Sequence, residues 1–249
     1  MVAQRALDYR EVETEYILFL DDDVYLPPDG VEYLFNAMKQ YDGDVISPDV
    51  FNNAGRSTKQ EIPLILSGRI SVRYKDNTWG YKVMRNGGYS YNKHPHPIMK
   101  SQTNAGPCFL CKKNDFEKIR FQEELWLDDM PYALGEDQTM FYKMFLSGLN
   151  VLTSYDSGIK HLDAGTTIKN VEKEKVLAFC DCRFKLIFWK RFLFDNVTRA
   201  NKVVNLICFV YTMIINLLIS LIKGNTTIFK QKYYGYKSGF HFLTTNSSK

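Results

Sequence analysis

The stretch of residues 16–24, YILFLDDDV, constrains the fold of this chain more than any other part of the sequence. Its first five residues are apolar or aromatic without alternation, which predicts a strand buried on both faces in a parallel sheet. Asp21, Asp22 and Asp23 follow where such a strand would leave the sheet, and α/β folds gather ligands at such positions. Adjacent carboxylates repel one another unless a cation offsets them, and their oxygens suit Mg²⁺ or Mn²⁺. The same residues also suit a polar turn, because Pro27-Pro28-Asp29-Gly30 continues the turn chemistry.

Length and composition favour one sizeable domain with an additional segment. The chain has 249 residues, 45% of them hydrophobic, which is enough to build a core. The net charge of +4 is mild and forms no basic stripe, so nucleic acid is not an expected partner. Five cysteines without a disulfide framework favour a reducing, cytoplasmic setting. Cys108 and Cys111 have the spacing of a zinc or redox half-site, but they lie in an apolar run and we interpret them as strand residues.

The remaining elements alternate between helices and strands, as in an α/β fold. Residues 1–15 resemble the end of an amphipathic helix, and Asp29 is a candidate N-cap for a helix over residues 31–41. Further strands are predicted over residues 44–50, 108–111 and 151–155. Residues 56–100 are aromatic and rich in turn residues, which predicts a loop or an edge hairpin whose aromatics either stack on a sugar or pack on one another. His94 and His96 in this segment lack a nearby third metal ligand.

A second group of acids opens a predicted helix further along the chain. Gly135, Glu136 and Asp137 precede a helix over residues 138–147. An N-cap role would explain Asp137 alone, but it does not explain two acids after a glycine. His161 lies in a polar loop; a single histidine is usually structural, yet beside two acidic sites it is also a candidate metal or diphosphate ligand. The small residues Asn104-Ala105-Gly106 before a strand would let a ligand approach the backbone closely.

In order and spacing, these motifs resemble those of the family 2 glycosyltransferases of GT-A fold, over about residues 6–190. The motifs are Leu20-Asp21-Asp22-Asp23, Asn104-Ala105-Gly106 before a strand, Gly135-Glu136-Asp137 opening a helix that ends Leu146-Ser147-Gly148, and His161 followed by Gly165-Thr166. The resemblance implies an α/β GT-A domain with a Rossmann-like mixed sheet over residues 1–170. It also implies an inverting enzyme that moves a sugar from a nucleotide-sugar donor to a hydroxyl of a glycan or lipid-linked acceptor, as in polysaccharide biosynthesis.

The resemblance also assigns expected roles to individual residues. Asp21 and Asp23 would hold Mg²⁺ or Mn²⁺ on the donor diphosphate, with Asp22 nearby and His161 as a third metal ligand. Asp137 would be the general base that deprotonates the acceptor hydroxyl. The residues expected to contact the donor are Asp21, Asp22, Asp23, Asn104, Ala105, Gly106 and Glu136. The chemistry of these residues agrees, because a leaving diphosphate needs charge neutralisation and the nucleophile needs a proton acceptor.

Family members begin with a strand, helix and strand that grip the nucleotide, and this unit is expected ahead of the acids of residues 21–23. It typically occupies on the order of 80 residues, about half of an ordinary domain. The sequence leads us to expect a truncated GT-A domain, or half of a split enzyme whose other half comes from a separate chain. A non-catalytic, membrane-associated remnant is the main alternative. A metal-dependent nucleotidyltransferase is a second one, against which Glu136-Asp137 at a helix start and the His161 loop favour glycosyl transfer.

The last part of the chain is predicted to contact a membrane. Residues 171–202 mix aromatic residues such as Phe184 and Phe188 with Lys and Arg, which is typical of an amphipathic interfacial helix. Residues 203–222 are uncharged and long enough to span a bilayer. Asn205 and Asn216 lower the hydropathy of this segment, so a helix in the membrane plane or packed on protein is also open.

The two asparagines are eleven residues apart, so they share a helix face. We expect them to face protein while the opposite face meets lipid. Residues 223–249 are expected to form a basic tail beside the cytoplasmic leaflet. Together these features predict a membrane-associated protein on the cytoplasmic side of the cell membrane.

Overall fold

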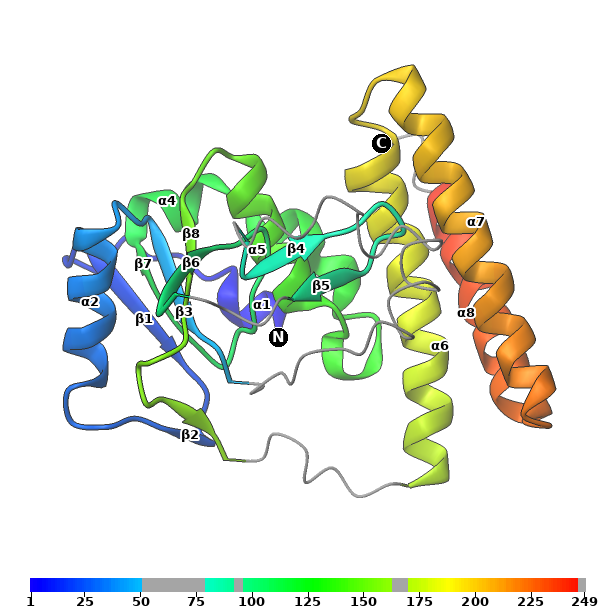
Figure 1. Ribbon diagram of the computed structural model, residues 1–249, viewed down its shortest axis with the longest axis horizontal. Helices are drawn as coiled ribbons and strands as arrows, with labels where there is room; N and C mark the ends of the chain where they lie inside the picture. The colour runs from blue at the N-terminus through cyan, green and yellow to red at the C-terminus, as the bar shows by residue number, and fades with distance from the viewer. Residues whose placement is uncertain (51–78, 92–95, 163–169, 246–249) are drawn as a thin grey trace.

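A mixed five-stranded sheet forms the centre of the protein in this computed structural model (Figure 1). The structure describes residues 1–50, 79–91, 96–162 and 170–245. Across the sheet the strands are β1 (Tyr16–Leu20), β7 (Cys108–Lys112), β3 (Val45–Pro48), β8 (Val151–Ser154) and β6 (Ile98–Lys100). Strands β3 and β8 are parallel and the other neighbours antiparallel. This confirms the mixed α/β fold expected from the sequence.

Helices cover both faces of the sheet. On one face, α2 (Gly30–Gln40) packs Leu34 and Met38 against apolar residues of β3, β7 and β8. On the other face, α4 (Lys113–Lys118), α5 (Glu136–Leu146) and α6 (Val171–Phe188) form a larger aromatic cluster around Phe109. The short helical segments are α1 (Val2–Arg5), η2 (Phe121–Leu127), η3 (Pro131–Ala133) and η4 (Trp189–Phe194).

Two separate antiparallel pairs complete the described strands. Strand β2 (Val24–Tyr25) pairs with β9 (Lys160–His161), and β4 (Tyr81–Val83) pairs with β5 (Tyr89–Tyr91), each antiparallel. The β4–β5 pair agrees with the hairpin predicted in the aromatic segment. Most of that segment lies outside the described residues, as do His94, Gly165 and Thr166.

The apolar run of β1 has a different cause from the one predicted. Its pairing was predicted to be parallel, and this is wrong, because β1 is the edge of the described sheet and pairs antiparallel with β7. Both of its faces nevertheless pack on apolar residues, since Tyr16 and Leu18 contact the α2 side and Phe19 the α5 side. Two cores, rather than two parallel neighbours, account for the missing alternation.

Cys108 and Cys111 both lie in β7, as the strand interpretation predicted, and both are buried free thiols. Their side chains point to opposite faces of the sheet, so Cys108 joins the α2 cluster and Cys111 the α5 cluster. Burial raises the pKa of both thiols, that of Cys108 to about 12. Cys108 and Cys111 therefore do not form a shared metal or redox half-site, because their side chains point apart and their raised pKa values disfavour the thiolate.

The amino-terminal helix is much shorter than predicted. Helix α1 has four residues instead of an amphipathic run through residue 15, and the chain then continues irregularly to β1. The carboxylate of Asp128 accepts hydrogen bonds from the N–H groups of Val2 and Ala3 at 2.9 and 2.8 Å. This contact satisfies the free donors at the helix start and fixes the short helix to the domain.

Three long helices form the carboxyl-terminal part: α6, α7 (Arg199–Ile222) and α8 (Thr226–Thr245), with η4 between α6 and α7 (Figure 1). The prediction that the aromatics of residues 171–202 face a bilayer is corrected, because Phe184 and Phe188 are buried in the aromatic cluster of the domain. Most of the expected basic tail is helical, because residues 226–245 form α8.

Helix α8 is held against α6 at two glycines one helical turn apart. A Cβ at Gly235 would overlap the backbone carbonyl of Phe179, and one at Gly239 would lie 3.1 Å from the carbonyl oxygen of Arg183. Small residues four apart allow helix backbones to approach closely. This packing explains why a segment with weak helix propensity is helical here.

We predict that Gly235→Val destabilises the packing of α8 on α6, because the new side chain has no space against the Phe179 carbonyl. Overpacking of this kind typically lowers the free energy of unfolding by about 1–3 kcal/mol. Thermal unfolding followed by circular dichroism measures the effect. Ser238→Ala on the same helix is the control, and an equal loss in both variants would contradict the close approach at Gly235.

Candidate functional site

The antiparallel pairing of β1 with β7 brings the first aspartate of the acidic cluster to the Asn104-Ala105-Gly106 motif. Leu20 lies opposite Cys108, so the end of β1 meets the start of β7. The N–H of Asp21 donates to the carbonyl of Pro107 at 2.8 Å. The Asp21 side chain is 41% exposed and its neighbour Asp22 is exposed, so this end of the strand is open to solvent.

The small β2–β9 pair brings His161 to Asp23. Val24 is opposite His161, and Nε2 of the imidazole lies 2.9 Å from Oδ2 of Asp23. The N–H of Leu162 also donates to the carbonyl of Asp23 at 2.8 Å. The structure thus joins two of the predicted metal ligands that are far apart in sequence. Nδ1 of His161 is buried and has no hydrogen-bond partner among the described residues.

Helix α5 begins with the second group of acids, and its first turn lies against Gly106. Gly135 has φ of +90°, a left-handed conformation that turns the chain into the helix. Asp137 does not cap the helix; it lies within its first turn. A Cβ at Gly106 would overlap the Asp137 carboxylate. The backbone at Gly106 is therefore approached closely, as predicted, but by a side chain of the protein itself.

Arg5 of α1 joins these elements and was not identified from the sequence. Its Nη1 lies 2.9 Å from Oδ1 of Asp137 and 2.8 Å from Oε1 of Glu136. Its Nη2 donates to the carbonyl of Gly106 at 3.1 Å and lies 3.9 Å from Oδ1 of Asp21. One buried guanidinium thus contacts both acidic motifs, although Asp21 and Asp137 are far apart in the sequence.

The charges around Arg5 do not balance, because one cation faces three carboxylates. Burial lowers the pKa of the Arg5 guanidinium, but the charges of Asp137 and Glu136 outweigh burial and raise that pKa above its ordinary value. Burial, followed by repulsion from Asp137, raises the pKa of Glu136 to about 8. Burial also raises the pKa of Asp21, while the positive charge of Arg5 lowers it by a smaller amount. Burial and the neighbouring Asp137 therefore favour the protonated form of Glu136, whereas Arg5 favours its ionised form.

Asn104 and Ala105 hold the loop in place with their own bonds. Nδ2 of Asn104 donates to the carbonyl of Leu152 at 2.9 Å, and its Oδ1 accepts a hydrogen bond from Thr153 at 2.7 Å. The carbonyl of Ala105 accepts from the hydroxyl of Ser47 at 2.7 Å. The predicted donor contacts of these residues stay predictions, and the observed contacts fix the loop that carries Gly106.

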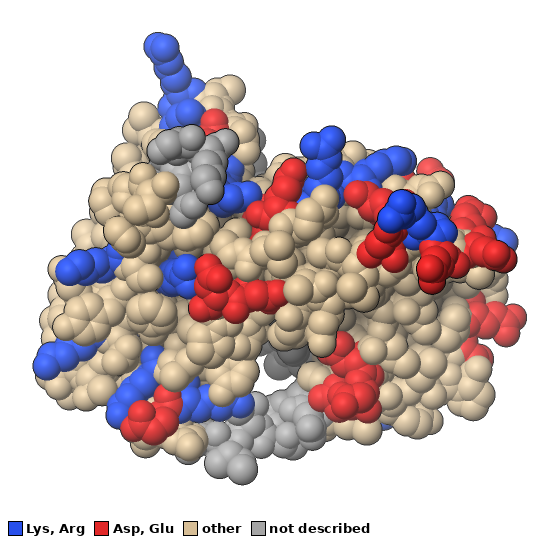
Figure 2. All heavy atoms as spheres, turned by 180° about the vertical axis from the view of Figure 1, so that it is seen from behind, with Lys and Arg blue, Asp and Glu red and all other residues tan. Residues whose placement is uncertain are grey.

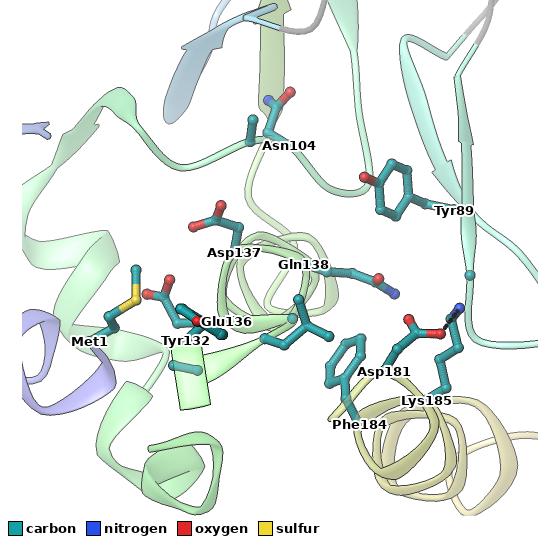
Figure 3. Close-up of a pocket in the computed structure, with 15 residues that line it drawn as sticks. Met1, Tyr89, Asn104, Tyr132, Glu136, Asp137, Gln138, Asp181, Phe184 and Lys185 are labelled. Carbon is teal, nitrogen blue, oxygen red and sulfur yellow. Dashed lines mark hydrogen bonds and ion pairs between the residues drawn. The ribbon is translucent and has the colours of Figure 1, made fainter. Parts of the chain in front are cut away.

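A pocket of about 480 Å³ opens beside Asp137 (Figure 3). Glu136, Asp137 and Asn104 line one side of it, and Tyr89 of β5 and residues of α6 line the other. On α6, Lys185 and Asp181 form an ion pair at 2.7 Å within the pocket wall. The volume lies within the range of small-molecule sites. The sequence did not predict that Tyr89, Phe184 and Lys185 share a pocket, because only the fold brings residues 56–100 and 171–202 together.

The carboxylates of this site fit a divalent cation whose coordination the phosphates of a substrate would complete. Among the described residues, no group of three His, Cys, Asp or Glu side chains converges to hold a metal ion alone. Mg²⁺, however, is commonly bound by one or two carboxylates together with substrate phosphates. Asp21 and Asp23 offer partly exposed carboxylates for that purpose, at 41% and 32%. His161 is placed to orient Asp23 rather than to form the third corner of a closed site.

We predict that the stability of Glu136→Gln relative to the unchanged protein rises with pH. The Glu136 carboxyl of the unfolded chain releases its proton near the ordinary pKa of 4.5, whereas the folded protein keeps this proton up to about pH 8. Glu136 therefore lowers stability progressively across that window. The Gln side chain cannot ionise, so the variant does not lose this stability as the pH rises. The loss in the unchanged protein amounts to at most about 1.4 kcal/mol for each pH unit.

Unfolding midpoints of both proteins at pH 5, 6.5 and 8 measure the difference. Glu123→Gln, at a half-exposed carboxylate paired with Lys143, is the matched control. A relative stability that falls with pH would mean that Glu136 is ionised and stabilised by Arg5, contrary to the charge balance described above.

Comparison with known proteins finds one family to which part of this chain is similar. Residues 3–120 match the model of the family described as Glycosyl transferase family 2. A search of curated proteins returned no match. The matched region contains Arg5, the three aspartates of residues 21–23 and Gly106, and the sheet is of the mixed α/β kind expected for this family. Residues 3–120 are therefore similar to a family 2 glycosyltransferase domain, and the mixed α/β fold is consistent with a GT-A-like domain.

Proposed function

We propose that this protein transfers a sugar with inversion from a nucleotide-sugar donor to a hydroxyl of a glycan or lipid-linked acceptor. One observation carries the proposal: Arg5 contacts both Asp21 and Asp137, so the two acidic motifs share one site. Glycosyl transfer needs charge neutralisation at the leaving group and a proton acceptor for the nucleophile. The site offers residues for both tasks on either side of a single guanidinium.

In this proposal Asp21 and Asp23 hold Mg²⁺ or Mn²⁺ together with the donor diphosphate. The bound cation would neutralise the charge that develops on the leaving diphosphate. His161 orients Asp23 through their hydrogen bond of 2.9 Å. Asp22 is exposed next to them and adds negative charge at the rim.

Asp137 is the proposed general base. Its carboxylate is 36% exposed, borders the pocket, and keeps one oxygen in contact with Arg5. The ion pair orients the carboxylate while leaving part of it open to an acceptor hydroxyl. Glu136 beside it is buried and protonated near neutral pH, which leaves Asp137 as the open acid of the pair.

The pocket between α5 and α6 is the proposed acceptor site. Tyr89 presents an aromatic ring toward it, and the Asp181–Lys185 pair provides polar groups on the far wall (Figure 3). Aromatic faces and charged pairs are the groups that bind sugar rings and their hydroxyls. Helix α7 is long and apolar enough to cross a membrane, so we place the enzyme at the cytoplasmic side of the cell membrane, beside such an acceptor.

We predict that Asp137→Asn reduces transfer by at least about 100-fold, the typical contribution of general-base catalysis, while donor binding is kept. Asp23→Ala is expected instead to weaken donor binding that depends on Mn²⁺. Release of nucleoside diphosphate from a panel of nucleotide sugars, with calorimetric binding of the active donor, separates the two effects.

Asp29→Asn is the matched control, because this aspartate is exposed in the same loop and its side chain caps no helix. Full turnover in both Asp137→Asn and Asp23→Ala would contradict the assigned roles. If the protein without substitutions neither binds nor cleaves any nucleotide sugar of the panel, the result would favour the non-catalytic alternative.

A further inference from the structure

Helix α7 has one continuous apolar face that the rest of the described protein does not cover. Five exposed residues recur at the spacing of a single helix stripe: Val203, Ile207, Ile214, Leu218 and Leu221, which are 60, 62, 46, 44 and 44% exposed. Only 17% of the most apolar part of α7 is buried. The stripe carries no charge over about 27 Å of helix, at 1.5 Å per residue.

The opposite face of α7 is attached to the protein along its length. Nδ2 of Asn205 donates to the carbonyl of Leu193 at 2.6 Å, and its Oδ1 accepts from Arg85 at 2.8 Å. Lys232 of α8 donates to Oδ1 of Asn216 at 2.7 Å. Both asparagines therefore face protein, as predicted, while the contact of the opposite face with lipid stays a prediction.

These attachments determine how α7 can lie. Arg85 belongs to the turn between β4 and β5, so the catalytic domain itself holds the first half of α7. Helix α8 holds the second half, and α8 is packed on α6 at Gly235 and Gly239. An α7 that crossed a bilayer would break these contacts or carry the domain and the lysines of α8 into the hydrocarbon.

Charge selects the surface that the stripe contacts. Residues 196–249 contain seven Lys or Arg and no Asp or Glu: Arg199, Lys202, Lys223, Lys230, Lys232, Lys237 and Lys249. Two copies of this region would repel each other, whereas an anionic lipid surface would attract it. In Figure 2 the side with these helices, at the left, is mostly uncharged with dispersed Lys and Arg, and most of the visible Asp and Glu lie toward the other side.

The exposed positions of α8 suit the same surface. Tyr233 and Tyr234 are 51 and 50% exposed, and Lys230 and Lys237 are exposed one turn before and after them. Tyrosines and lysines of this kind gather at the level of lipid headgroups. The α7–α8 pair thus combines a purely apolar stripe with a basic and aromatic one, as in helices that lie on membranes.

We propose that α7 lies in the plane of an anionic lipid surface, with its Val203–Leu221 stripe in the acyl region and without crossing the bilayer. The proposal rests on the membrane association suggested above and defines its mode: an interfacial anchor held rigidly by the catalytic domain. Both ends of α7 stay on the same side of the membrane as the active site.

Depth measurements in vesicles test this arrangement on the full chain. Single cysteines replace Val203, Ile214 and Leu221 in a Cys208→Ser background, since the four other cysteines are buried. Each carries an environment-sensitive fluorophore, which is quenched by nitroxides at defined lipid depths. In phosphatidylcholine vesicles that contain phosphatidylglycerol, we expect all three labels at one shallow depth. A deep label at residue 214 between two shallow ones on opposite sides would show a spanning helix and overturn the proposal.

Charge variants test the lipid specificity. Ile214→Glu is expected to reduce binding to the mixed vesicles at least tenfold, while Leu146→Glu, at an equally exposed apolar residue of α5, leaves binding unchanged. Equal binding to vesicles of phosphatidylcholine alone would overturn the anionic preference. Unaltered binding by Ile214→Glu, or a dimer that hides the labels without lipid, would overturn the anchor. Vesicle binding requires no catalysis, so these outcomes do not depend on the proposed transfer reaction. Failure of the anchor can therefore be distinguished from failure of the transfer reaction.

Discussion

The candidate site depends on one buried interaction, the contact of the Arg5 guanidinium with Asp21, Glu136 and Asp137. Arg suits this position because its planar group has five donors that remain charged, so it can reach two carboxylates and the Gly106 carbonyl at once. Removing one partner of a buried ion pair typically costs about 3–5 kcal/mol, because the other charge remains uncompensated. The acids that the sequence displays so clearly could not lie this close together without it.

Arg5 is in turn held by contacts that have no chemical role in the site. Asp128 binds the N–H groups at the start of α1, and the hydroxyl of Tyr9 donates to the Arg5 carbonyl at 2.9 Å. Gly106 leaves the space that the Arg5 and Asp137 side chains fill. The geometry of the site is therefore set by a short helix, a glycine and a loop, in addition to the carboxylates themselves.

The sequence predicted the parts of the fold and site that depend on local sequence patterns. The acidic motifs each follow or open an element with a clear apolar pattern, so Asp21, Asp23 and Asp137 were found with nearly correct element boundaries. Arg5 gave no such signal, because a single arginine among charged neighbours looks like a solvated residue. Its importance follows only from a count of carboxylates that need a cation.

The errors at the two ends of the chain have the same physical origin. Residues 1–15 have apolar positions at helical spacing, but Asp128 binds the start of α1 and the helix ends at Arg5. No helix was predicted over residues 226–245, whose glycines lower helix propensity, yet Gly235 and Gly239 allow the close approach to α6. Tertiary contacts outweighed local propensity in both directions.

Helix α6 links the α7–α8 pair to the pocket next to Asp137. Asp181, Phe184 and Lys185 on one of its faces line the pocket next to Asp137. The opposite face contacts α8, since the carbonyls of Phe179 and Arg183 lie against Gly235 and Gly239. Because these backbones touch without flexible side chains between them, α8 cannot shift along α6 without a clash. The orientation of the pocket relative to the α7–α8 pair is therefore fixed, and an anchor at α7 would hold the pocket at a constant height and angle above the lipid surface.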